Sequence, residues 1–338
     1  MFQRAIIVNS ILSSLIWYHA QTYPLPLTWS KKINVHLFKF IWKSKVEPIA
    51  RSTLNLDKNK GGLSVFNIFI KSECLFACRM LKQFLENENQ TSLIACYNAI
   101  RLNSLVNIST LPSNVSFIST PYYDKGISTI RKCLKINSFP NISSKMTYMH
   151  ILNNLTPKIE EKYPLHNWGN IWKNLHFKYI LVNTREILYK YIHEILPNKH
   201  RLKQIRRSAD DLCEHCNVPE TNIHMLYYCR NIKLSKKFLE NMLIHCQIGE
   251  CNLLKLFFLD ISKREKKKKN TVILLISLYI SSVWYGRANK AQIVNMYMSV
   301  IFNHIRLLKS LLGNDLDKLF TPEFCSLNIE LMSRCQGR

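Results

Sequence analysis

The segment Leu212–Cys229 reads Leu-Cys-Glu-His-Cys-Asn-Val-Pro-Glu-Thr-Asn-Ile-His-Met-Leu-Tyr-Tyr-Cys. Two residues separate Cys213 from Cys216, seven separate Cys216 from His224, and four separate His224 from Cys229. Three thiolates and one imidazole form a tetrahedral ligand set that suits zinc. A catalytic zinc keeps one position open for water, whereas this set fills all four positions. The spacing therefore predicts one structural Zn²⁺, around which the C-terminal part of the chain folds.

These cysteines could also be ordinary buried thiols, and neighbouring residues could also be ligands. Ordinary buried thiols need an apolar face, and a loop rich in Glu, Asn and Pro offers none. His215 lies between the first two cysteines, which points it away from the metal, so we expect it beside the site or on the surface. Cys246 with His245 is a weaker alternative pair of ligands.

The chain is strongly basic. Its 338 residues include 47 Lys and Arg against 22 Asp and Glu, a formal net charge of +25. Such an excess favours a polyanionic partner, with nucleic acid (RNA or DNA) ahead of a membrane surface. A basic, solvated surface that binds nothing remains the alternative, because charge bears on association and not on fold.

Two basic clusters are candidate contacts for phosphates. The first leads directly into Leu212–Cys229, which we call the metal loop. The second is the run Lys263–Lys269, which is either a solvated loop or a phosphate contact. The predicted nucleic-acid contacts are Arg201, Lys203, Arg206, Arg207, Lys266, Lys267, Lys268 and Lys269.

The eleven cysteines favour reduced thiols and an intracellular location, in nucleus or cytoplasm. A secreted glycoprotein is the competing reading, because Arg4 precedes the apolar run Ala5–Tyr18 and five Asn-X-Ser/Thr sequons occur. Polar residues interrupt that run, and sequons arise by chance in a chain rich in Asn and Ser. The run Val272–Tyr285 is shorter than the roughly 20 residues that span a bilayer, so it predicts a buried core helix and no membrane partner.

Apolar periodicity predicts a mainly α fold, with a short hairpin at the metal loop as its only strand content. Helical spacing covers residues 2–20 and 30–43, and the prolines of Tyr23–Pro26 between them must break the helix, which predicts a helical hairpin. A further helix is expected over Phe66–Leu85, and residues 86–160 form a loose connector rich in Asn and Ser. Helices also follow Tyr163, the second ending at Leu196-Pro197, and another spans 291–312.

Short motifs near the N-terminus occur in a characteristic order. They are Asn9, Phe40-Ile41-Trp42, Ile49-Ala50-Arg51 and Gly61-Gly62-Leu63. In this order they resemble the region just after the polymerase core of non-LTR (LINE-type) retrotransposon reverse transcriptases. The resemblance covers roughly residues 1–85 and implies a helical thumb.

The metal loop and its flanks resemble a second part of the same proteins. The shared features are Leu196-Pro197, Arg201-Leu202, the two first cysteines, Glu220-Thr221 before His224, and Cys229 after an aromatic pair. Trp284, Arg287 and Asn289 are similar to the helix that closes this zinc-binding domain, although Ala288 splits the Arg-Asn pair. The resemblance implies a zinc-binding domain over 161–312, followed by a tail, 313–338.

The sequence offers no complete catalytic site. Ala209-Asp210-Asp211 is similar to the polymerase motif that binds two Mg²⁺ ions, but that chemistry needs a tight hairpin between apolar strands and another aspartate. Residue 1 already lies past the expected end of the polymerase palm. We therefore expect no enzyme activity and a zinc-stabilised, nucleic-acid-binding fragment of a transposable element, with a full-length retrotransposon protein as a further candidate partner. A structural or protein-interaction remnant is the alternative.

Overall fold

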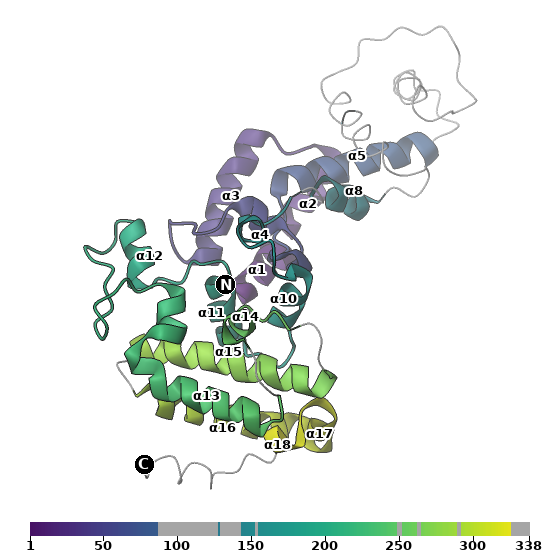
Figure 1. Ribbon diagram of the computed structural model, residues 1–338. Coiled ribbons are helices and arrows are strands. Elements are labelled where there is room, and N and C mark those ends of the chain that lie inside the picture. The colour runs from purple at the N-terminus through teal and green to yellow at the C-terminus, as the bar shows by residue number, and fades with distance from the viewer. Residues whose placement is uncertain are drawn as a thin grey trace, which may run out of the picture. The chain divides into compact units, whose positions relative to one another are not determined.

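The computed structural model describes residues 1–86, 128, 143–152, 155–248, 252–261, 265–288 and 292–325. Within these ranges the regular secondary structure is helical, which confirms the predicted mainly α fold (Figure 1). In place of a hairpin at the metal loop, the described residues form an isolated antiparallel bridge between Leu212 and Pro219. The chain divides into two compact units, Met1–Asp57 with Gly61–Thr156, and Lys58–Lys60 with Pro157–Arg338. We call them the N-terminal and C-terminal units.

The helices of the N-terminal unit follow the sequence pattern closely. They are α1 (Phe2–Ile7), the π-helix η1 (Val8–Leu12), α2 (Ser14–Thr22), α3 (Leu27–Trp42), α4 (Arg51–Asn55), α5 (Ile68–Glu86) and α8 (Ser144–Leu152). The chain leaves the helical conformation between Thr22 and Leu27, at the two prolines, and α3 returns to contact α1. The predicted hairpin is therefore confirmed.

The Gly61-Gly62 turn of the N-terminal unit depends on having no side chains. Gly61 has a φ of 76°, and a Cβ added to Gly62 would lie 2.0 Å from the carbonyl oxygen of Leu56. Asn9 then joins η1 to the strand-like residues after the turn, since its Nδ2 donates to the Ser64 carbonyl (2.7 Å) and its Oδ1 accepts from the Phe66 N–H (3.1 Å). Motifs far apart in sequence thus form one packed corner.

Part of the predicted loose connector is helical. Helix α8 packs on α5, where Tyr148 and Leu152 are buried with Cys74, and the Tyr148 hydroxyl accepts a hydrogen bond from the Asn67 N–H (2.8 Å). The predicted connector residues 87–127, 129–142 and 153–154 lie outside the described residues.

The C-terminal unit is built around one long helix. Its elements are η2 (Lys58–Lys60), α9 (Lys158–Lys162), α10 (Trp168–Leu175), α11 (Val182–Ile192), α12 (Lys199–Gln204), η3 (His224–Tyr228), η4 (Arg230–Ile232), α13 (Lys233–His245), α14 (Leu253–Phe257), α15 (Lys266–Ala288), α16 (Ile293–Leu312), η5 (Gly313–Asp315), α17 (Leu316–Leu319) and α18 (Pro322–Cys325). Helices α11, α13, α14, α16 and α17 all contact α15, and Figure 1 shows α13, α15 and α16 running alongside one another. Every residue from 270 to 283 is buried.

Three details differ from the sequence prediction or add to it. Helix α11 ends at Ile192, four residues before Leu196, because Glu194 adopts a left-handed conformation (φ 55°) and the Ile195 N–H bonds back to the Lys190 carbonyl. Residues assigned to a tail instead form α17 and α18, with Phe320 and Phe324 buried. Among the described residues, no helix is both long and apolar enough to cross a membrane.

Candidate metal centre

The first two cysteines of the metal loop lie on one tight turn. The Cys213 N–H bonds to the Val218 carbonyl (2.8 Å), and the Asn217 N–H bonds back to the Cys213 carbonyl (2.9 Å). Asn217 adopts a left-handed conformation (φ 54°), which asparagine tolerates better than most residues. The turn therefore places Cys213 and Cys216 close together, as two ligands separated by two residues require.

His224 and Cys229 lie at the two ends of the π-helix η3. The Thr221 hydroxyl accepts from the His224 N–H (3.1 Å), and the Cys229 N–H bonds to the His224 carbonyl five residues back (2.8 Å). The hydroxyl of Tyr279 on α15 donates to the Leu226 carbonyl (2.8 Å), which fixes η3 against the core helix. The wide π turn thus presents both side chains to the turn that carries Cys213 and Cys216.

The four predicted ligands converge. Their ligand atoms all lie within 4.8 Å of one another; the Sγ atoms of Cys213 and Cys229 are 3.7 Å apart, and those of Cys216 and Cys229 are 3.9 Å apart. Tetrahedral zinc with Zn–S bonds of about 2.3 Å separates two sulfurs by about 3.8 Å. His224 Nε2 is buried and has no hydrogen-bond partner among the described residues. This cluster could hold a metal ion.

The burial of the ligand side chains also favours a bound cation, because buried thiolates need a positive charge nearby. Burial, with a smaller contribution from the neighbouring Cys213, raises the pKa of the Cys229 thiol to about 12. Burial lowers the pKa of His224, which keeps its imidazole neutral and able to act as a ligand. The Arg230 N–H donates to Cys216 Sγ (3.2 Å), a contact that stabilises a thiolate. A bound cation would supply the remaining stabilisation, since coordination deprotonates a thiol outright.

A buried ion pair connects the metal loop to the C-terminal end of α15. Glu220, 5% exposed, accepts from Nε of Arg287 (2.5 Å) and also from its Nη2. The same carboxylate accepts from the backbone N–H of Lys199 (2.9 Å), at the first turn of α12, where the Asn198 side chain also caps the helix. One carboxylate therefore joins three segments that are distant in sequence.

The two predicted basic clusters lie at opposite ends of α15. Arg201, Lys203, Arg206 and Arg207 sit on and just after α12, beside the metal loop, whereas Lys266–Lys269 form the first turn of α15. At 1.5 Å per residue, the 19 residues from Lys268 to Arg287 separate these ends by about 28 Å. The structure does not bring the clusters together. Lys263, in the same predicted run, lies outside the described residues.

The members of the first cluster differ in their availability. Lys203 donates to Asp211 (2.7 Å), which also pairs with His200 Nδ1 (3.1 Å). Arg206 and Arg207 are exposed and form no ion pair among the described residues. In the second cluster, burial lowers the pKa of Lys269, and nearby Lys173 lowers it further.

Three further candidates from the sequence are Asp211, the pair Cys246 with His245, and Asn289. Asp211 is occupied by Lys203 and His200, and its carbonyl accepts from the Glu220 N–H (2.7 Å). Cys246 is fully buried while His245 is exposed, so that pair does not converge. Asn289, the last predicted residue of the closing helix, lies outside the described residues.

Sequence reasoning missed the basic residues that follow Cys229, and it did not anticipate the exposure of Tyr228 before it. Tyr228 is 63% exposed, and Arg230, Lys233 and Lys237 are exposed along η4 and α13. Helical spacing from the metal ligand Cys229 could have found them.

No protein-family model matches the chain, and a search of curated proteins finds no similar sequence. The resemblance to retrotransposon proteins therefore stays a prediction from its motifs.

Proposed function

We propose that the Cys3His cluster binds one structural zinc ion and that the protein is a non-catalytic, nucleic-acid-binding fragment of a non-LTR retrotransposon reverse transcriptase. The observation that carries this proposal is the convergence of four ligand atoms within 4.8 Å on a loop that continues from the basic helix α12. Sulfur separations near 3.8 Å favour zinc, and a closed ligand set favours a structural role. Reduced cysteines favour an intracellular location.

Binding would act mainly on the phosphate backbone of RNA or target DNA. Exposed Arg206 and Arg207, and the lysines at the start of α15, have the charge for such contacts. A lysine-rich first turn at the positive end of a helix dipole is unfavourable unless an anion compensates it. About 28 Å of α15 separates Lys268 from Arg287, so a strand in duplex geometry, at about 3.4 Å per nucleotide, must exceed eight nucleotides to span this length of helix.

Two measurements test the proposal. Metal analysis of reduced, chelator-free protein should find one zinc per chain. Affinity for a single-stranded RNA or DNA of about 20 nucleotides should fall steeply with salt, and replacing Lys266–Lys269 by glutamine should lower the slope of log K against log[salt] by up to about 3. Exchange of Lys58 and Lys60, together with Lys31 and Lys32, is the matched charge control. Absence of zinc would refute the metal proposal, and absence of salt-sensitive binding would refute the nucleic-acid proposal.

A second candidate function is protein interaction through the N-terminal unit. Ile7, Ile11, Leu15 and Tyr18 follow one another at helical spacing along α1, η1 and α2, and they are between 38% and 75% exposed. Such a stripe is typical of a contact surface. Replacing Ile11 and Leu15 by serine should abolish any self-association or partner binding that depends on this stripe, without altering zinc content.

A further inference from the structure

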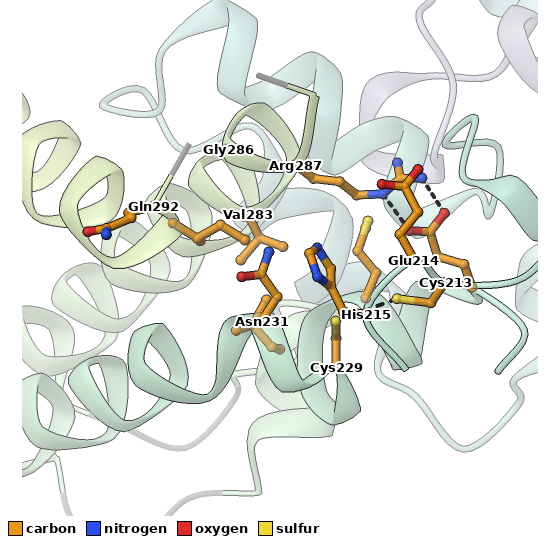
Figure 2. A pocket seen from close by; sticks show the side chains of 13 residues that line it. Cys213, Glu214, His215, Cys229, Asn231, Val283, Gly286, Arg287 and Gln292 are labelled. Atoms are coloured by element: carbon orange, nitrogen blue, oxygen red, sulfur yellow. Dashed lines mark hydrogen bonds and ion pairs between the residues drawn. The ribbon is translucent and has the colours of Figure 1, made fainter. Parts of the chain in front are cut away.

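An open pocket of about 470 Å³ lies directly beside the metal cluster, between the metal loop and the start of α16. Cys213 and Cys229 form part of its wall, and α15 contributes the opposite side through Val283, Gly286 and Arg287 (Figure 2). This volume is within the range of about 300–1,000 Å³ that is typical of small-ligand sites. The metal loop, which has no catalytic ligand position to spare, therefore also forms one wall of a cavity.

The pocket combines apolar walls with a few polar groups. Met225, Ile232, Val283 and Ile293 supply the apolar surface. Gly286 lets α16 begin close to α15, because a Cβ at this position would lie 2.9 Å from Ile293 Cγ1. Such walls accommodate the faces of a flat ring better than an extended, strongly hydrated group.

Three polar side chains line the same space. They are the imidazole of His215 on the metal loop, the amide of Asn231 on η4 and the amide of Gln292 just before α16, all labelled in Figure 2. Each amide offers hydrogen-bond donors and an acceptor, and the imidazole adds two ring nitrogens. The charged groups of the lining are already compensated, since Arg287 pairs with Glu220, and Glu214 with Lys199 (3.2 Å). The pocket thus favours a neutral, polar-edged ring over an ion.

Exposed basic residues adjoin the pocket-lining residue Asn231 in the sequence. Arg230 immediately precedes Asn231 on η4, and Lys233 and Lys237 follow on the exposed face of α13. Tyr228, 63% exposed, comes just before the ligand Cys229. A phosphate bound by Arg230 would lie one residue away from a side chain that lines the pocket.

We propose that this pocket receives one unstacked nucleobase from a single strand of RNA or DNA, while Arg230 and Lys233 contact the flanking phosphates. The proposal rests on the nucleic-acid binding proposed above and adds a reason to prefer single strands to duplexes. Only an unpaired base is free to leave its stack and present both its faces and its edge. His215, Asn231 and Gln292 contact the edge, and the apolar wall contacts the ring.

The test uses fluorescence anisotropy with the full-length, zinc-loaded protein and three probes: a 20-nucleotide single strand, the same strand with abasic sites throughout, and a duplex. The base-containing strand should bind about tenfold tighter than the abasic strand. Asn231→Ala should remove most of this difference, whereas Asn241→Ala, an exposed exchange of the same type on α13, should leave it intact. Zinc content, measured on each variant, separates loss of the pocket from loss of the metal loop.

Each outcome separates this inference from the proposed function. Equal affinity for abasic and base-containing strands overturns the pocket inference while nucleic-acid binding stands. The same conclusion follows if Asn231→Ala and Asn241→Ala behave alike, or if the duplex binds as tightly as the single strand. Failure of all three probes to bind at low salt overturns both proposals.

Discussion

Removing Arg287 should destabilise the C-terminal unit more than any exchange of an exposed arginine. Glu220 is 5% exposed, and Arg287→Gln would leave its carboxylate with the Lys199 N–H as its principal remaining donor. Breaking a buried pair by removing one partner costs about 3–5 kcal/mol. We expect about 3 kcal/mol, the lower end, because the Lys199 bond persists and the Arg287 side chain is 26% exposed.

The assay is urea unfolding of the zinc-loaded protein, followed by metal release into a coloured chelator, which reports on the metal loop specifically. Arg206→Gln, at an exposed position, is the control and should change the free energy of unfolding by less than about 0.5 kcal/mol. Adding Glu220→Gln to Arg287→Gln should recover part of the loss, because a neutral amide is cheaper to bury than an unpaired carboxylate. A loss below about 1 kcal/mol, or no recovery in the double variant, would refute this account of the pair.

Three further predictions concern other parts of the protein. Cys213→Ser and His224→Ala should each abolish stoichiometric zinc binding and unfold residues 196–245, because the metal-binding energy stabilises the fold of this region. Amide hydrogen exchange should show the loss of protection there, and retained protection would contradict this prediction. Burial lowers the pKa of His304, so the folded state favours its neutral form. The free energy of unfolding should therefore fall as pH drops below about 6.5, by up to about 1.4 kcal/mol per pH unit. His304→Gln should flatten this pH dependence in urea unfolding. Gly62→Ala should cost about 3 kcal/mol because its Cβ meets the Leu56 carbonyl, whereas Gly169→Ala, with its nearest neighbour at 3.8 Å in α10, should stabilise by up to about 1 kcal/mol in thermal unfolding.

Local patterns in the sequence predicted the elements well because local physics determines them. The prolines between Thr22 and Leu27 end one helix and precede the next. The apolar run that begins at Val272 is buried in α15 as far as Val283, whereas Tyr285 at its end is 37% exposed. The convergence of the three cysteines and His224 was predictable for a similar reason, since their spacing within one short loop limits where the side chains can meet. The N-terminal motif residue Asn9 has a visible role in the packed corner at Phe66.

Long-range pairing was not predictable in the same way. Glu220 and Arg287 are 67 residues apart, and each has many possible partners in a chain with 47 basic and 22 acidic residues. The pocket beside them depends on where α15 meets the metal loop, a tertiary relation that no periodicity encodes. Helices α17 and α18 are each four residues long, too short for a helical pattern to emerge from their sequence.

The first turn of α15, which carries Lys266–Lys269, does not depend on the metal loop for its packing. Residues 270–283 are buried mainly by contacts of α15 with α11, α13 and α16, whereas the metal loop meets this helix at Tyr279 and near Arg287. Loss of the proposed zinc should therefore disrupt the proposed base pocket and the α12 cluster directly. The first turn of α15 should keep its support from Asn270 and Thr271, which bond to Leu319 and Thr321. Any salt-sensitive binding that survives in metal-free protein should consequently come from Lys266–Lys269, and it should make no distinction between base-containing and abasic strands.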